Sequence, residues 1–347
     1  MAFNPNSLQN PIMNVINQFG NIHLYAPNNQ ITINDFVKIS DLGEGRHGFV
    51  KQVRYKKDNN IYALKMIPQD TFLTKEGERN EVKETDYLRE VAVLKDLKTR
   101  NNDKVIKLYM NFEDKDYRYI VTDFVNGKNL NKLREEHQKK NEYIQQKYMI
   151  NIFRQLLEIL IFLHEECFII HRDIKPENII LDYNNNIKLI DFGHSVYLIN
   201  SNPELVSRRS FKGSKKYAPP EIIYSKFRNY DYKVDIFSTG FAIYNIMNPN
   251  DKNGKTNLPQ DTDDNLQRRE QKNENEFYDV WFMDLIKKLY SIDPNERPTA
   301  REALQLLFTG MNNPRKVGIV ITINEDNIGI MRNFSNRSKW TEFKYEY

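Results

Sequence analysis

Hydrophobic positions follow two different patterns along the chain. Runs of apolar residues with polar neighbours, bounded by turn residues, predict five strands, over residues 36–40, 49–53, 61–67, 105–112 and 119–124. A helix is expected between the third and fourth strands, over 81–97, because apolar residues recur there at helical spacing. The first three strands are most simply arranged as an antiparallel set.

From the pair Asn126-Gly127 onward the pattern is helical. Residues 144–164 carry one apolar stripe, made of Ile150, Phe153, Leu157, Leu160 and Ile161. We therefore predict an α+β fold with two lobes. The N-lobe, over 36–125, is a small antiparallel sheet with one main helix, and the C-lobe, over 128–308, is larger and mainly helical.

Three segments lack the pattern of a packed lobe. Residues 1–32 are rich in Asn, Gln and Pro, which predicts a flexible arm. Residues 248–276 are almost wholly polar and predict a surface insertion in the C-lobe. The tail, over 311–347, has one strand-like run at 317–323 and several aromatic residues, so we expect it to dock on one of the lobes.

Charge and cysteine content exclude several classes of function. The 347 residues include 51 Lys or Arg and 47 Asp or Glu, a net charge of +4, so we expect no nucleic-acid partner. The single cysteine, Cys167, excludes an internal disulfide and favours a reducing compartment, the cytoplasm or the nucleus. No apolar run approaches the roughly 20 residues that span a membrane, so we expect no membrane partner.

A glycine cluster follows the first predicted strand. The run from Leu42 to Val50 fits the pattern G-x-G-x-x-G-x-V through Gly43, Gly45 and Gly48. Glycines allow a tight strand–turn–strand whose N–H groups approach phosphates closely, but ordinary hairpins show the same pattern. No helix follows and the G-K-[ST] ending is missing, so neither a dinucleotide-binding turn nor a Walker P-loop is indicated.

Lys65 lies in an apolar strand pattern, Tyr62-Ala63-Leu64-Lys65-Met66-Ile67. A lysine in this context is either exposed or paired with a buried anion. Glu90, in the helix predicted to follow, is the candidate partner because it stands beside an apolar stripe. Such a pair could hold an ammonium group where it meets phosphate oxygens.

Three further motifs stand in a fixed order. They are His171-Arg172-Asp173-Ile174-Lys175-Pro176-Glu177-Asn178, then Asp191-Phe192-Gly193, then Pro219-Pro220-Glu221. With the glycine cluster and Lys65, they are the signature set of protein kinases. Over residues 36–308 the chain resembles a eukaryotic-type protein kinase, and Lys175 resembles the lysine typical of the Ser/Thr-specific branch.

The resemblance implies a role for each motif residue. The catalytic residues would be Asp173, Lys175, Lys65 and Glu90, with Asp173 accepting the proton of the attacking hydroxyl. The nucleotide-binding residues would be Leu42, Gly43, Gly45, Gly48, Val50, Ala63, Lys65, Asp123, Val125 and Ile180. Asn178 and Asp191 would bind Mg²⁺, which prefers oxygen ligands. Glu221 would pair with Arg297, and Asp235 would cap the catalytic loop.

The implied function is transfer of the γ-phosphoryl group of ATP, with Mg²⁺, to Ser or Thr hydroxyls of protein substrates. Two alternatives stay open: a non-catalytic kinase-like scaffold, which would be expected to have lost a catalytic residue, and a small-molecule kinase. Ser210 matches the family's activating phosphosite, and Arg172 would supply a cation for its phosphate. Either an upstream kinase or autophosphorylation would add that phosphate.

The resemblance also bears on substrate choice. Relatives that prefer basic substrates present acids at three positions, which here are Asn129, Glu177 and Asn245. The loop facing the substrate is basic, through Arg208, Arg209, Lys212, Lys215 and Lys216. Because charges in a groove select complementary charges, we expect weak selection for basic residues before the acceptor. We also expect tolerance of, or mild preference for, acidic residues just after it.

Overall fold

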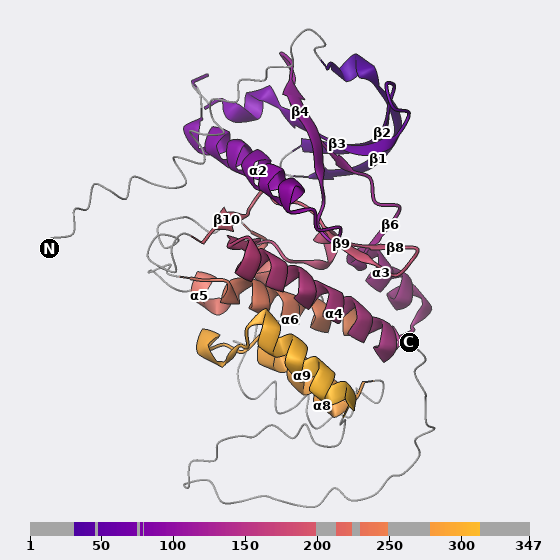
Figure 1. The fold of residues 1–347 in the computed structure, drawn as a ribbon, viewed down its shortest axis with the longest axis vertical. Helices are drawn as coiled ribbons and strands as arrows, with labels where there is room; N and C mark the ends of the chain where they lie inside the picture. The colour runs from indigo at the N-terminus through magenta and orange to yellow at the C-terminus, as the bar shows by residue number, and fades with distance from the viewer. Residues whose placement is uncertain are drawn as a thin grey trace, which may run out of the picture.

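The structure, a computed structural model, describes residues 31–45, 48–74, 77–78, 80–198, 213–223, 230–248 and 278–312. These residues form a sheet with one long helix above a mainly helical lobe (Figure 1). The predicted α+β fold class and two-lobe arrangement are confirmed. The predictions for the N-terminal arm, the polar insertion beyond residue 248, the tail strand and Ser210 concern residues outside these ranges.

The N-lobe sheet has five antiparallel strands in the order β1-β2-β3-β5-β4. They are β1 (Phe36–Gly45), β2 (Gly48–Tyr55), β3 (Ile61–Pro68), β5 (Tyr117–Asp123) and β4 (Leu108–Glu113). Side chains alternate between two cores, because successive strand residues face opposite ways. Leu64 belongs to a small core within the sheet, whereas Ile67 and Ile120 join a larger core. Phe36 stacks on Phe112 at 5.7 Å, so the sheet curls until its two edges meet.

One predicted strand is shorter than expected. The sequence pattern extended it from residue 105, but β4 begins at Leu108. Val105 instead forms an isolated parallel bridge with Leu189 of the C-lobe. The apolar run therefore serves two purposes, since its first residues link the lobes and only the rest belongs to the sheet.

Helix α2 (Glu81–Arg100) packs on β4. Its first turn is capped by Asn80, whose side chain accepts a hydrogen bond from the backbone of Lys83 at 3.2 Å. It ends at Asn101, which adopts a left-handed conformation with φ of 52°. The predicted helix over 81–97 is thus confirmed, with one further turn at its C-terminal end.

The C-lobe is built around two buried helices. Its helices are α3 (Leu130–Lys140), α4 (Gln146–Ile161), α5 (Pro220–Ile223), α6 (Lys233–Met247), α8 (Val280–Leu289) and α9 (Ala300–Asn312). Apolar side chains bury α4 on several sides and α6 almost completely. The helix predicted over 144–164 is present as α4, which continues into a π-helical turn, Phe162–Glu166.

Two small sheets lie where the lobes meet (Figure 1). One contains β6 (Gly127–Asn129), β8 (Ile179–Asp182) and β9 (Ile187–Leu189), and the other pairs β7 (Ile169–Ile170) with β10 (Val196–Tyr197). The turns between these short strands carry the conspicuous motifs of the sequence. Among the described residues, none of the helices is long and apolar enough to cross a membrane.

Candidate active site

Lys65 connects the two lobes. It lies on β3, and its ammonium is 2.6 Å from Glu90 of α2 and 3.4 Å from Asp191 of the C-lobe. Burial by itself lowers the pKa of a lysine, but the two carboxylates outweigh it, so the pKa of Lys65 lies above its ordinary value. Lys65 is therefore a fixed positive charge, and the pairing with Glu90 predicted from sequence is present.

Asp191 is held in an unusual backbone conformation, with φ of 64°. Burial alone would raise the pKa of its carboxyl group, but Lys65 holds that pKa far below the ordinary value. Gly193 follows two residues later, where a β-carbon would lie 3.2 Å from a carboxylate oxygen of Glu90 and 3.3 Å from one of Asp191. A glycine at 193 thus lets the two acids approach Lys65 together.

In the catalytic loop, three polar groups surround the carboxylate of Asp173, which is 4% exposed. Its Oδ1 accepts the backbone N–H of Ser214 at 2.8 Å. Its Oδ2 accepts hydrogen bonds from the ammonium of Lys175 at 2.7 Å and from the side-chain amide of Asn178 at 3.0 Å. Burial raises the pKa of an aspartate, but these bonds, that of Lys175 first, hold the pKa of Asp173 below its ordinary value. The ammonium of Lys175 also donates to the hydroxyl of Ser214 at 2.9 Å.

Asp235 on α6 fixes the backbone of this loop. Its two carboxylate oxygens accept the N–H groups of His171 and Arg172, each at 2.8 Å. His171 in turn bonds the carbonyl of Ile190 at 3.1 Å, and its ring meets Phe192 edge-on at 4.8 Å. The capping contact predicted for Asp235 is thus present, and it ties the loop to the segment that carries Asp191.

The glycine cluster forms the tight end of the hairpin between β1 and β2. Gly43 pairs with Val50, and Gly45 pairs with Gly48. At Gly48, φ is 122° and a β-carbon would lie 2.0 Å from the carbonyl oxygen of Met66. Only glycine fits at 48, which lets the hairpin lie close against β3.

The apolar residues that the resemblance assigns to nucleotide binding come from both lobes. Val50 and Ala63 lie on the N-lobe sheet, Val125 follows it, and Ile180 lies on β8; all four are partly exposed. Leu42, on β1, is 40% exposed. Apolar side chains left open beside Lys65 could accept the flat face of an aromatic ring.

Asp123, which the resemblance assigns to nucleotide binding, makes contacts through its side chain. Its Oδ2 accepts the ammonium of Lys188 at 2.7 Å and the N–H of Lys107 at 3.1 Å. Since Lys188 lies on β9, this contact links the end of the N-lobe sheet to the C-lobe. The sequence did not indicate it.

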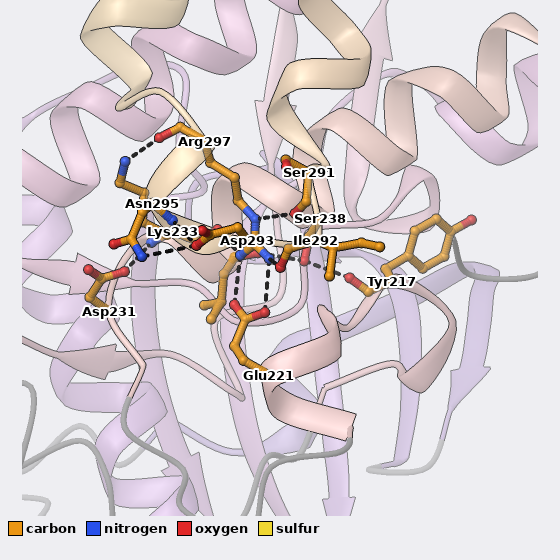
Figure 2. Close-up of polar contacts among 11 residues, drawn as sticks. Tyr217, Glu221, Asp231, Lys233, Ser238, Ser291, Ile292, Asp293, Asn295 and Arg297 are labelled. Carbon is orange, nitrogen blue, oxygen red and sulfur yellow. Dashed lines mark hydrogen bonds and ion pairs between the residues drawn. The ribbon is translucent and has the colours of Figure 1, made fainter. Parts of the chain in front are cut away.

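Glu221 and Arg297 form the ion pair that the sequence predicted. The guanidinium of Arg297 donates to the two carboxylate oxygens of Glu221 at 2.6 and 2.9 Å (Figure 2). Arg297 is 1% exposed and also bonds the carbonyls of Ser291 at 2.8 Å and Ile292 at 3.1 Å. These contacts supply hydrogen-bond acceptors for a buried guanidinium. They also link α5, which carries Glu221, to the segment that follows α8.

The residues expected to bind Mg²⁺ fit that ion. The amide nitrogen of Asn178 is engaged by Asp173, which leaves its oxygen as the atom available to a cation. Asp191 supplies a carboxylate that stays ionised. Within the described ranges, no group of three or more His, Cys, Asp or Glu could hold a metal ion. Mg²⁺ commonly takes only one or two protein oxygens, with phosphates and water completing its shell.

Two buried arginines have partners that sequence reasoning missed. Arg118 on β5 donates to both carboxylate oxygens of Glu84 on α2. Arg172 is 2% exposed and donates to the carbonyl of His194 at 2.5 Å and to the hydroxyl of Tyr230 at 2.7 Å. Arg118 could have been found by the criterion that selected Lys65, a charged residue in an apolar strand.

Comparison with known proteins identifies the family. The protein kinase domain family matches residues 36–309. Aurora kinase C of Mus musculus is 32% identical over 277 residues, covering 79% of this chain and 91% of that protein. An Aurora kinase of Yarrowia lipolytica is 34% identical over 216 residues, covering 62% of this chain but only 53% of that protein. The chain belongs to the protein kinase family. It is an ATP-dependent protein kinase of the serine/threonine class.

Proposed function

We propose that this chain phosphorylates protein substrates on Ser or Thr through the site centred on Asp173, with ATP and Mg²⁺ as cofactors. The contacts of Lys65 with Glu90 and Asp191 carry this proposal, because kinase chemistry needs the ion pair and the metal-binding aspartate in place together. Phe192 is buried against His171, which supports the same arrangement.

The proposed nucleotide site uses both lobes. Gly43, Gly45 and Gly48 cover the phosphates, while Lys65 neutralises the α- and β-phosphates. The base lies among Leu42, Val50, Ala63, Val125 and Ile180, with backbone bonds at Asp123 and Val125. Asn178 and Asp191 would hold Mg²⁺, and the ion would supply positive charge beside the phosphates.

The proposed chemistry transfers one phosphoryl group and one proton. The bond between the γ-phosphorus and the oxygen that bridges to the β-phosphate breaks, which releases ADP. The substrate hydroxyl oxygen forms the new bond, and Asp173 accepts its proton. Because the pKa of Asp173 is lowered, it is ionised and accepts a hydrogen bond from the incoming hydroxyl. Lys175, at 2.7 Å from Asp173, stabilises the charge on the group in transit.

The experiment measures transfer of labelled γ-phosphate from ATP to a generic basic protein and to the chain itself. We expect Asp173→Ala to lower the rate by about 1,000-fold or more, in the upper part of the range for general-base catalysis. Both proteins should show the same thermal midpoint within a few degrees. A wild type no faster than Asp173→Ala would exclude this function and favour the non-catalytic scaffold.

Regulation through Ser210 stays a prediction, because this residue lies outside the described ranges. We propose that phosphorylation there, by an upstream kinase or by the chain itself, orders the segment and raises activity. Mass spectrometry of the active enzyme should find the phosphate, and Ser210→Ala should lower kcat. Full activity of that variant would contradict the proposal. The cytoplasmic or nuclear location, and the absence of nucleic-acid and membrane partners, likewise stay predictions.

A further inference from the structure

Arg118 is a buried cation in the N-lobe, 5% exposed. Its two terminal nitrogens donate to the carboxylate of Glu84 at 2.8 and 2.9 Å, and its Nε lies 3.1 Å from Glu113. The guanidinium carbon also lies 4.1 Å from the ring centre of Phe72 and 4.9 Å from that of Tyr87. Burying a guanidinium is costly unless it is paired, and two carboxylates and two ring faces offset that cost here.

The side chains of Arg118 and Lys65 lie on the same face of the sheet. In the register of β3 and β5, Lys65 lies opposite Ile120, and Arg118 lies opposite Ile67. Residues two apart on a strand face the same way, so the two cations are diagonal neighbours on that face. Both reach α2: Lys65 binds Glu90, and Arg118 binds Glu84 six residues earlier. At 1.5 Å per residue, the two contact points on the helix are about 9 Å apart.

The C-terminal end of α2 is already anchored elsewhere. The segment that follows it is bonded to the C-lobe, because Leu189 of β9 accepts from the N–H of Ile106 at 3.1 Å and donates to the carbonyl of Lys104 at 3.0 Å. Glu90 therefore lies between this anchor and the contact of Arg118 with Glu84. A rigid helix held at both ends has one orientation, whereas a helix held at one end can swing.

We propose that Arg118 is a positioning residue for the catalytic ion pair: its bidentate bond to Glu84 holds the N-terminal half of α2 where Glu90 meets Lys65. This inference rests on the proposed kinase function of the same site. The paired hydrogen bonds fix direction as well as distance, which a single ammonium contact does not. Tyr87, packed on the ring of Phe72 at 5.8 Å, adds an apolar contact on the same side of the helix.

Glu113 provides a matched control, because it binds the same arginine from a different element. Its carboxylate contacts Arg118 from β4, within the sheet, so removing its charge weakens the pairing without releasing α2. Glu84→Gln and Glu113→Gln remove the same charge from the same cation. We expect kcat/KM for ATP to fall about tenfold in Glu84→Gln and less than about twofold in Glu113→Gln.

Two further readouts separate positioning from general stability. Amide hydrogen exchange in the first two turns of α2 should quicken in Glu84→Gln and stay unchanged in Glu113→Gln. In a Glu90→Gln background, adding Glu84→Gln should lower kcat/KM by less than about twofold. The ion pair between Lys65 and Glu90, through which Arg118 is proposed to act, is already lost in that background. If Glu84→Gln unfolds below the assay temperature, Glu84→Asp replaces it, keeping the charge while shortening the reach.

The outcomes are distinct. The proposal is supported if Glu84→Gln lowers kcat/KM strongly, Glu113→Gln does not, and Glu84→Gln has little effect in the Glu90→Gln background. Equal effects of the two glutamine variants, no effect of either, or losses that add to that of Glu90→Gln would overturn it. A wild type no faster than Asp173→Ala would instead remove the proposed function, so the two failures are distinguishable.

Discussion

Asp173 shows how the active site keeps a buried carboxylate ionised. Both of its oxygens accept hydrogen bonds, from Ser214 on one side and from Lys175 and Asn178 on the other. Each donor stabilises the charged form, and together they outweigh the cost of burial. The same balance holds at Lys65, where two acids outweigh the burial of one ammonium. At Asp173 and Lys65, therefore, the partners of a buried charge outweigh the cost of its burial.

Cys167 shows the opposite balance: burial disfavours its charged form, and the neighbouring groups do not outweigh that effect. It is the single cysteine of the chain, is 2% exposed, and burial raises the pKa of its thiol to about 12. We expect iodoacetamide at pH 8 to leave the native protein unmodified and to modify it fully in denaturant, because the thiolate is the reactive form. Intact mass would record the single adduct, and rapid labelling of the native protein would contradict the burial.

The same thiol gives a pH dependence of stability. Its folded pKa lies above the unfolded value of 9.0, so folding favours the protonated form. Its contribution is present below pH 9 and is lost as pH rises from about 9 to about 12, because only the unfolded chain releases the proton. Denaturant unfolding at several pH values should show a smaller loss in Cys167→Ala than in wild type.

Single residues were predictable where order along the chain defines a motif. The resemblance to protein kinases selects Lys65, Asp173 and Asp191, and the contacts of Lys65 with Glu90 and Asp191 agree with it. The partner of Arg118 could not be predicted, because α2 offers several acids and only the three-dimensional register selects Glu84. The partner of Arg172 could not be predicted either, since Tyr230 stands 58 positions away along the chain.

Helix packing in the C-lobe depends on one close approach between elements. At Gly240 of α6, a β-carbon would lie 2.6 Å from the β-carbon of Leu289 and 3.1 Å from the carbonyl oxygen of Ile286, both on α8. Gly240→Ala therefore forces α6 and α8 apart. We expect a loss of about 1–3 kcal/mol in the free energy of unfolding, measured in denaturant.

Gly43→Ala is the control for this substitution. A β-carbon at Gly43 would have nothing within 4 Å, so its stability should stay within about 0.5 kcal/mol of wild type. The comparison uses stability alone, since Gly43 belongs to the proposed nucleotide site. Equal stability of Gly240→Ala and wild type would mean that the two helices separate without cost.

Elements were predictable to the extent that periodicity defines them. Strands β1 to β3 and helices α2 and α4 follow from alternation and helical spacing. Their ends do not, because they depend on contacts from distant parts of the chain. Val105, predicted as part of a strand, instead pairs with Leu189, and the last turn predicted for α4 is π-helical in the structure. The short strands β6 to β10 carry too few residues for any period to be visible.

At the scale of the whole molecule, one apolar core crosses the boundary between the lobes. It includes Leu94 and Leu108 from the N-lobe and Phe192 from the C-lobe, with His171 packed on Phe192. The curl of the sheet follows from ring contacts between its two edges, which no local pattern contains. The site thus lies between two bodies that share a core.

The charges around the catalytic loop lead to a prediction about substrates. Of the three positions where relatives that favour basic substrates carry acids, only Glu177 is charged and exposed. The side chain of Asn129 caps α3, accepting from the backbone of Lys132 at 2.9 Å, and Asn245 is 4% exposed. Little negative charge therefore remains to attract a basic segment.

Positive charge lies next to the residue whose backbone contacts Asp173. Lys215 and Lys216 are exposed and directly follow Ser214, whose N–H donates to Asp173. A substrate hydroxyl placed at Asp173 therefore brings the next residues of its chain near two cations. We expect acidic residues after the acceptor to raise kcat/KM by about two- to fivefold, the size of an exposed ion pair, and the gain to shrink as salt rises.

A degenerate-peptide phosphorylation screen measures this preference directly. Lys215→Glu with Lys216→Glu should reverse it, because like charges then face each other. Lys139→Glu with Lys140→Glu is the matched control: it makes the same change in net charge on two exposed lysines at the end of α3, in a different element from the loop that carries Ser214. Selection for Arg two or three residues before the acceptor, by about tenfold or more, would contradict the prediction, since an exposed pair contributes far less than that. Reversal in the control as well would trace the preference to net charge, and reversal in the first variant alone would trace it to Lys215 and Lys216.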